Sequence, residues 1–141
     1  MAKLSISQST REAVAQRANY CCEYCKSQDK YAPNSFTIDH ILPESLSGSS
    51  DIGNLAYACF LCNRLKSNKV KVLDRSSHLW TPVFNPRINH WEEHFSWNED
   101  ATLIIGLTSI GRCTVNELQL NRQKLVEYRR NLIVFGVHPP T

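Results

Sequence analysis

Two pairs of cysteines, each with two residues between its members, constrain this chain more than any other feature of its sequence. The first pair is Cys22 and Cys25, and the second is Cys59 and Cys62. Four thiolates in two C-x2-C pairs suit a tetrahedral structural zinc site, since zinc accepts soft sulfur ligands. The thirty-three residues between the pairs exceed the spacing of an ordinary zinc ribbon. We therefore expect the zinc site to enclose an additional structural unit.

The roles expected of the other two cysteines depend on the redox environment of the protein. The N-terminus lacks the apolar stretch of a secretory signal, so we expect a cytoplasmic protein, in which thiols stay reduced. Cys21 is an alternative ligand to Cys22, but the two-residue gap to Cys25 favours Cys22. Cys113 stands alone in the sequence. We expect Cys21 and Cys113 to be packing thiols.

Length and composition exclude several classes of protein. With 141 residues, the chain is long enough for one hydrophobic core and too short for two full domains. No apolar run approaches the ~20 residues that cross a bilayer, so we expect no membrane partner. The formal net charge is +3, and four zinc-bound thiolates would lower it. Binding to nucleic acid must therefore be argued from where the positive charges lie.

The segment between the cysteine pairs combines short strands with a loop. Residues 36–38 and 55–58 are predicted strands, separated by a turn-rich loop of Ser, Gly and Asp. A helix is expected over about residues 61–70. A capping box at residues 9–12 predicts an earlier helix that begins there and ends near residue 19.

The second half of the chain shows fewer regular signals. Residues 74–86 contain two prolines and little periodicity, so we expect an irregular segment. Residues 95–97 and 102–107 predict a β-hairpin. A second capping box at residues 114–117 predicts the start of a long last helix. The packed face of this helix is expected to carry Leu118, Leu125 and Leu132.

A group of oxygen and nitrogen donors lies between and directly after the cysteine pairs. Its members are Asp39, His40, Asn54 and Asn63. Each has an ordinary explanation when taken alone, as a surface pair, a turn residue or a helix cap. With the cysteines, they form the order C-x2-C, Asp-His-Ile-x-Pro, Asn-Leu and C-x2-C-Asn-x2-Lys over about residues 17–68. This order resembles the HNH endonuclease family.

The resemblance implies a fold and a role for each of these residues. The implied fold is α+β: a ββα-metal (HNH, His-Me finger) core with zinc-binding knuckles, plus a C-terminal β-hairpin and helix extension. His40 corresponds to the general base, and Asp39 and Asn63 correspond to ligands of a catalytic divalent metal. Asn54 corresponds to the residue that braces the loop holding the base. Carboxylate and amide oxygens suit magnesium or manganese at such a site.

Basic residues follow the second cysteine pair. We expect Arg64, Lys66 and Lys69 to bind nucleic acid. Lys66 lies three residues after Asn63, so on a helix the two side chains would point the same way. A second basic group on the last helix is expected to be solvated, and it consists of Arg122, Lys124, Arg129 and Arg130.

These observations lead to one predicted function and one alternative. We predict an HNH nuclease core over residues 1–75 and an extension over residues 76–141 that packs on it. The predicted function is metal-dependent hydrolysis of phosphodiester bonds in nucleic acid, with DNA as the expected substrate. The alternative is a non-catalytic zinc module that only binds nucleic acid, which has no need of Asp39, His40 and Asn63 together. The sequence leaves the oligomeric state open.

Overall fold

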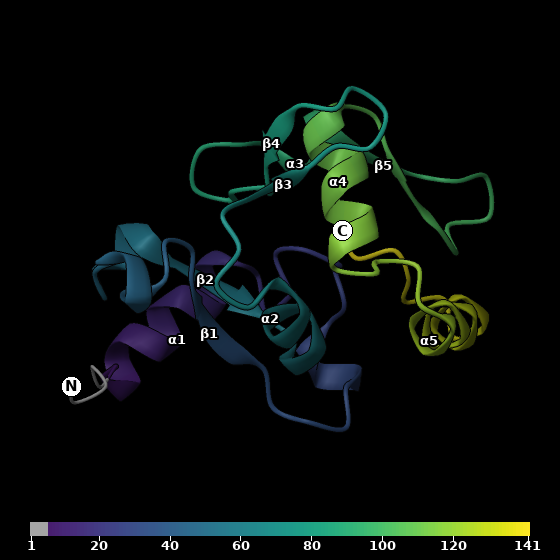
Figure 1. The fold of residues 1–141 in the computed structure, drawn as a ribbon. Helices are drawn as coiled ribbons and strands as arrows, with labels where there is room; N and C mark the ends of the chain where they lie inside the picture. Colours follow the sequence, from purple (N-terminus) through teal and green to yellow (C-terminus); the bar gives the residue numbers. More distant parts are fainter. Residues whose placement is uncertain (1–5) are drawn as a thin grey trace.

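Helices and two-stranded sheets alternate along the chain in the computed structural model, which describes residues 6–141 (Figure 1). Each sheet is an antiparallel pair of strands that follow one another in the sequence. The first sheet consists of β1 (Thr37–His40) and β2 (Leu55–Ala58), and it contacts α1 (Gln8–Arg17) and α2 (Phe60–Lys66). This mixture of helices and small sheets confirms the expected α+β class.

The β1–β2 sheet is buried on both of its faces. Leu55 and Tyr57 pack with Val14 of α1. Ala56 and Ala58 belong to the larger core around the cysteines. Because successive strand residues point to opposite faces, every residue of β2 is buried. The bounds of β2 match the prediction, whereas β1 begins one residue later and ends two residues later than the expected residues 36–38.

The connection between β1 and β2 folds back closely on the end of β1. The Pro43 carbonyl accepts hydrogen bonds from the N–H groups of Leu46 and Gly48, both at 2.9 Å. A Cβ atom at Gly48 would lie 1.7 Å from the Leu42 carbonyl oxygen. Only a residue without a side chain fits there. Gly53, in the same connection, has open space at the corresponding position.

The first two helices differ at their ends from the sequence prediction. Helix α1 begins at Gln8, before the predicted capping box, because Ser7 is its N-cap and accepts a hydrogen bond from the Thr10 N–H at 3.2 Å. Helix α2 ends at Lys66, earlier than residue 70. It ends there because Ser67 adopts a positive φ of 54°, which a right-handed helix cannot contain.

The second half begins with two hairpins. Strand β3 (Lys71–Leu73) pairs with β4 (Trp80–Pro82), so part of the segment predicted as irregular is a hairpin. The predicted boundary at residue 75 lies in the turn of this hairpin. A single helical turn, α3 (Trp91–His94), precedes β5 (Phe95–Trp97), which pairs with β6 (Ile104–Gly106). The second hairpin confirms the one predicted from the sequence.

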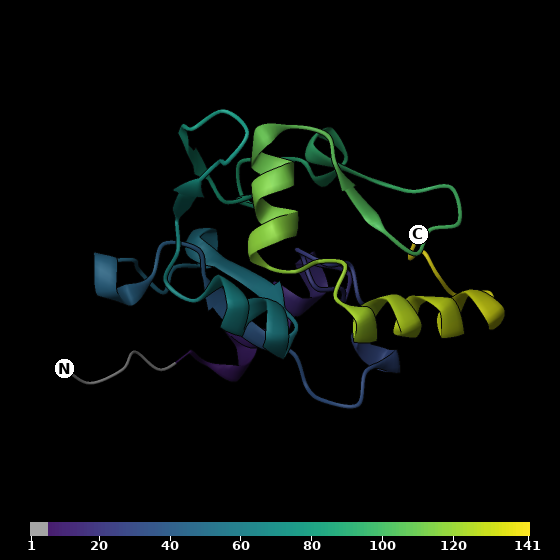
Figure 2. The same cartoon turned by 45° about the vertical axis from the view of Figure 1, so that its right-hand side comes forward.

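The expected long last helix is divided into two. Helix α4 spans Ser109–Glu117 and has Thr108 as its N-cap, so the pattern at residues 114–117 lies inside a helix and not at its start. Helix α5 spans Gln123–Val134. The chain turns between them, with α4 upright and α5 running across the lower part of Figure 2. The leucines of the predicted packed face are buried, as expected: Leu118, Leu125 and Leu132.

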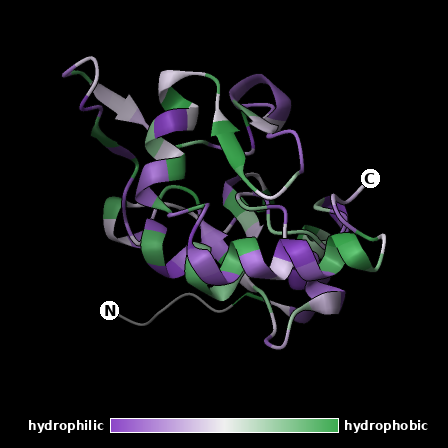
Figure 3. Ribbon diagram, turned by 90° about the vertical axis from the view of Figure 1, so that its right-hand side faces the viewer, coloured by the Kyte–Doolittle hydropathy of each residue, from purple (hydrophilic) through white to green (hydrophobic). Residues whose placement is uncertain are grey.

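One hydrophobic core joins the two halves of the chain. It includes Tyr24 and Ala58 from the first half and Phe84 and Trp91 from the second. The Trp91 Nε1–H donates to the Tyr24 carbonyl at 3.0 Å. Hydrophobic and hydrophilic residues alternate along the helices (Figure 3), as expected for helices that bury one side. Within residues 6–141, no helix has both the length and the apolar character that crossing a membrane requires.

We predict that Gly48→Ala destabilises the protein and that Gly53→Ala does not. The methyl group added at residue 48 would meet backbone atoms that cannot rotate away, and overpacking of this kind costs about 1–3 kcal/mol. Urea unfolding followed by circular dichroism measures the free energy of unfolding of each variant. Equal stability of the two variants would contradict the close approach of Gly48 to the end of β1.

Candidate functional site

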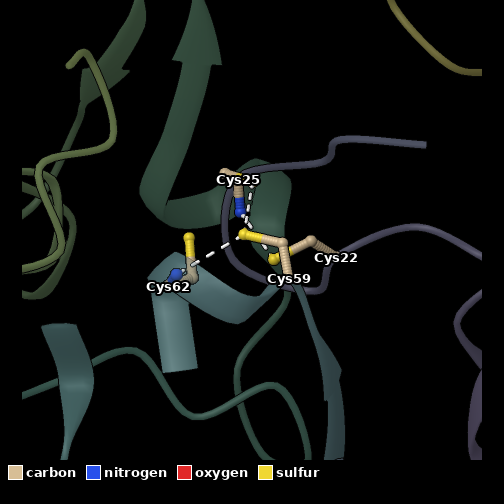
Figure 4. A group of neighbouring side chains, drawn as sticks. All are labelled: Cys22, Cys25, Cys59 and Cys62. Atoms are coloured by element: carbon tan, nitrogen blue, oxygen red, sulfur yellow. Dashed lines mark hydrogen bonds between the residues drawn. The ribbon is translucent and has the colours of Figure 1, made fainter. Parts of the chain in front are cut away.

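The four cysteines of the two C-x2-C pairs meet in one place. Their sulfur atoms lie within 4.8 Å of one another, and all four residues are buried. Figure 4 shows the side chains gathered around a common point from two separate segments of the chain. Within the part of the chain that the structure describes, no other His, Cys, Asp or Glu ligand atoms cluster in threes or more in this way. This cluster is called the cage below, and its members are Cys22, Cys25, Cys59 and Cys62.

Each cysteine pair turns a backbone N–H toward its own first sulfur. The Cys25 N–H lies 3.5 Å from the Cys22 Sγ, and the Cys62 N–H lies 3.4 Å from the Cys59 Sγ. Cys59 is also the N-cap of α2, so the second pair and the start of the helix are one structure. Hydrogen bonds from the three neighbouring thiols lower the pKa of Cys25. The cage is thus a buried, sulfur-only donor set of the kind that holds structural zinc.

Three of the predicted site residues line one open cavity of about 820 Å³. They are Asp39, His40 and Asn63, from β1 and α2. The sequence predicts a joint role for them, and all three residues line this cavity. Further polar residues of the same cavity were not predicted from the sequence: Arg11, Glu44, Ser67 and Asn68.

His40 is held through one of its two ring nitrogens. Its Nε2 lies 2.9 Å from the Ser50 Oγ and 3.3 Å from the Glu44 Oε1. The other nitrogen, Nδ1, has no hydrogen-bond partner among residues 6–141. In the tautomer whose Nε2 carries the proton and donates toward Ser50 and Glu44, Nδ1 is able to accept a proton.

Asn54 closes the loop that follows β1. Its Oδ1 accepts a hydrogen bond from the Leu42 N–H at 2.9 Å, and its Nδ2 donates to the carbonyls of Leu42 at 3.0 Å and Ser49 at 2.7 Å. Its backbone carbonyl accepts the Ile41 N–H at 2.9 Å. Asn54 does not line the cavity. It acts on the loop, and this requires a side chain that both donates and accepts.

Asp39 is buried against two partners, and this changes the interpretation of Lys66. The Lys66 Nζ lies 3.2 Å from the Asp39 Oδ2, and the Tyr24 hydroxyl donates to the same oxygen at 2.7 Å. The Lys66 Nζ also donates to the carbonyls of His40 at 3.3 Å and Ile41 at 3.2 Å. Only 1% of Lys66 is exposed. A phosphate cannot reach this ammonium group, so Lys66 holds the site together in place of the predicted nucleic-acid contact.

The cavity still offers oxygen atoms to a metal ion. Burial raises the pKa of Asp39, and the ion pair with Lys66 opposes that rise. The Asp39 Oδ1 has only a 3.4 Å contact with Lys66, so it retains acceptor capacity. The Glu44 Oε1 is buried and accepts no hydrogen bond of good geometry, although the His40 Nε2 lies close to it. Asn63 lines the same cavity, and carboxylate and amide oxygens are ligands that magnesium or manganese accept.

Other basic residues differ in how freely they face solvent. The Lys69 Nζ pairs with the Glu117 Oε1 at 2.6 Å, so its charge is already matched. Arg64 and Arg11 are exposed and form no ion pair within residues 6–141. Arg11 also lines the cavity. The sequence does not indicate that Arg11 lies at the cavity, because its position depends on how α1 packs on the β1–β2 sheet.

The basic residues near the last helix do not form the solvated group that the sequence predicted. Arg129 is 1% exposed, donates to two backbone carbonyls and lies over the Trp97 ring. Burial lowers the pKa of Arg129 to about 10. Arg122 is directed at the cage. Only Lys124 and Arg130 are exposed as expected.

Comparison with known proteins agrees with this arrangement. Residues 22–69 match the family model of HNH endonucleases. The match begins at the first cage cysteine and ends shortly after α2, so it includes the β1–β2 sheet and both segments that carry His40 and Asn63. No curated protein and no solved structure matches the chain.

We predict that Lys66→Ala destabilises the protein strongly, because it leaves the Asp39 carboxylate buried without its cation. Removal of one partner from a buried ion pair costs about 3–5 kcal/mol. Arg64→Ala, on the same helix but exposed, is the matched control and should change the free energy of unfolding by less than about 0.5 kcal/mol. Chemical unfolding of both variants provides the measurement. A Lys66→Ala protein with wild-type stability and reduced nucleic-acid affinity would restore Lys66 as a surface contact.

Proposed function

We propose that this chain, whose residues 22–69 belong to the HNH endonuclease family, hydrolyses phosphodiester bonds in nucleic acid, with DNA as the substrate. The family match by itself supports a nuclease or a nucleic-acid-binding role. The observation that favours cleavage is the single cavity shared by Asp39, His40 and Asn63. A module that only binds has no need of a histidine with a free ring nitrogen beside oxygen donors for a metal ion.

His40 is the proposed general base. Because Ser50 engages its Nε2, its Nδ1 accepts a proton from the water that attacks the phosphorus. Asn54 keeps the loop after β1 closed through its bonds to Leu42 and Ser49. Ser50 follows directly in this loop, so the brace also fixes the partner that orients the imidazole ring.

Asp39 and Asn63 are the proposed ligands of magnesium or manganese, and Glu44 supplies a further oxygen at the same cavity. When bound there, the metal ion would supply positive charge at the scissile phosphate and to the departing oxygen. Lys66 holds the Asp39 carboxylate in place from the protein side. The cage is buried and closed by four sulfur ligands, so its role is structural.

The proposed organisation follows from the shared core. The HNH core covers residues 1–75, and residues 76–141 form an extension that supports it. The extension contributes Phe84, Trp91 and Leu125 to the same hydrophobic cluster as the cage cysteines. Arg11 and Arg64 are the proposed phosphate contacts on the nuclease core, because both are exposed and their charges are unmatched in the described residues.

We predict that Arg11→Ala weakens binding to a fluorescently labelled DNA duplex and reduces the slope of log K against log salt by about 1. The reason is that Arg11 offers an unmatched charge at the wall of the cavity. Arg130→Ala removes the same charge from an exposed residue that does not line the cavity, and it should leave affinity and slope near the wild-type values. Fluorescence anisotropy at several salt concentrations provides both quantities. Equal losses of DNA affinity in the two variants would show that Arg11 acts only through the net charge of the protein.

We predict that purified protein nicks or cuts a supercoiled plasmid with magnesium or manganese and that His40→Ala lowers the rate by about 10²–10⁴-fold. Zinc content, circular dichroism and DNA binding of this variant should remain close to wild type, because His40 lies outside the cage. His90→Ala, which removes an exposed histidine outside the cavity, should cleave normally. Tight DNA binding by the wild type without cleavage under either metal would favour the non-catalytic zinc module.

A further inference from the structure

Arg122 reaches the cage from the second half of the chain, at the turn between α4 and α5. Its Nη2 lies 3.7 Å from the Cys59 Sγ, and its Nη1 lies 3.8 Å from the Cys62 Sγ. The Nη1 group also donates to the carbonyls of Leu118 and Gln119, both at 3.2 Å. The guanidinium is therefore held at the end of α4 while it faces two sulfur atoms of the second cysteine pair.

The Arg122 guanidinium faces the cage and meets no acidic side chain in the described part of the chain. Within residues 6–141, no carboxylate pairs with Arg122, and no other charged side chain donates a hydrogen bond to a cage sulfur. Four thiolates around one zinc ion carry an excess of negative charge. Burial of uncompensated charge is costly, so a cation in contact with the sulfurs lowers the free energy of the metal-loaded form.

The shape of the side chain fits this role. A guanidinium is planar and carries its N–H donors in a rigid fork, so it donates to Cys59 and Cys62 at the same time. An ammonium group offers a point charge on a flexible stem and would not reproduce both contacts. Donors that contact metal ligands from outside commonly change metal affinity by about 10–100-fold when they are removed.

We propose that Arg122 is an outer partner of the zinc centre, which neutralises the thiolates and links metal binding to the docking of the C-terminal extension. The extension then supplies an outer contact to the zinc site in addition to packing on the HNH core. Because the linkage is reciprocal, zinc binding stabilises the docked extension by the same free energy by which the docked extension stabilises bound zinc. This inference depends on the cage alone and is independent of nuclease activity.

Zinc affinity tests the proposal directly. Competition of the full-length zinc-loaded protein with a coloured chelator should show about tenfold or more weaker binding in Arg122→Gln. Arg122→Lys, which keeps the charge without the fork, should lie between Arg122→Gln and the wild type. Lys124→Gln is the matched control, because Lys124 lies close by in the sequence and does not contact a cage sulfur. Wild-type zinc affinity in Arg122→Gln would overturn the proposal.

A second measurement separates the N–H···S contacts from general loosening of the extension. In cobalt-substituted protein, loss of hydrogen bonds to the sulfurs should move the sulfur-to-cobalt charge-transfer band to lower energy in Arg122→Gln. Leu125→Ala removes a buried side chain of α5 that cannot donate a hydrogen bond to sulfur, so it should lower thermal stability without moving the band. If Arg122→Gln does not fold, Arg122→Lys carries the same test. An equal band shift in Leu125→Ala, or no shift in either Arg122 variant, would refute the role of Arg122.

Discussion

The cage is the constraint on which the rest of this structure depends. It joins residues 22–25 to residues 59–62 and so closes the segment that contains both strands of the β1–β2 sheet. A two-stranded sheet with four residues in each strand is marginally stable by itself in water. The cage fixes one end of this sheet, and Cys59 starts α2 at the same point. The position of the whole candidate site therefore follows from four sulfur atoms.

The same closure explains why a histidine, a carboxylate and an amide line one cavity. His40 ends β1, while Asn63 lies in the first turn of a helix that begins two residues after β2 ends. Lys66, one turn further along α2, reaches back to Asp39 and to the backbone around His40. Helix α2 thus carries Cys62 of the cage, Asn63 of the candidate metal site and Lys66, which pairs with Asp39.

Local spacing is sufficient to predict the cage, β2 and the β5–β6 hairpin, because these patterns extend over a few neighbouring residues. Helix ends are less predictable from the sequence. The capping pattern at residues 114–117 lies inside α4, since the Thr108 hydroxyl, further upstream, accepts the cap hydrogen bond from the Gly111 N–H. Strand β4 ends at Pro82, inside a segment with two prolines, and proline is unfavourable in strands, so the local composition favours an irregular structure there.

The sequence shows which side chains are charged, but it does not show which acceptor each of them contacts in the fold. Helical spacing predicts Lys66 beside the cavity, but the same spacing lets its aliphatic chain run inward to Asp39. Arg122 and Arg129 also turn inward, because sulfurs or backbone carbonyls offer them acceptors there. Arg11 is the opposite case, since the fold brings it to the cavity, where it has no acidic partner among residues 6–141. A basic residue with a buried acceptor stabilises the fold. A basic residue without such an acceptor has its charge available to bind a phosphate. The surface that binds nucleic acid can therefore be defined only after the acceptors of the buried cations are known.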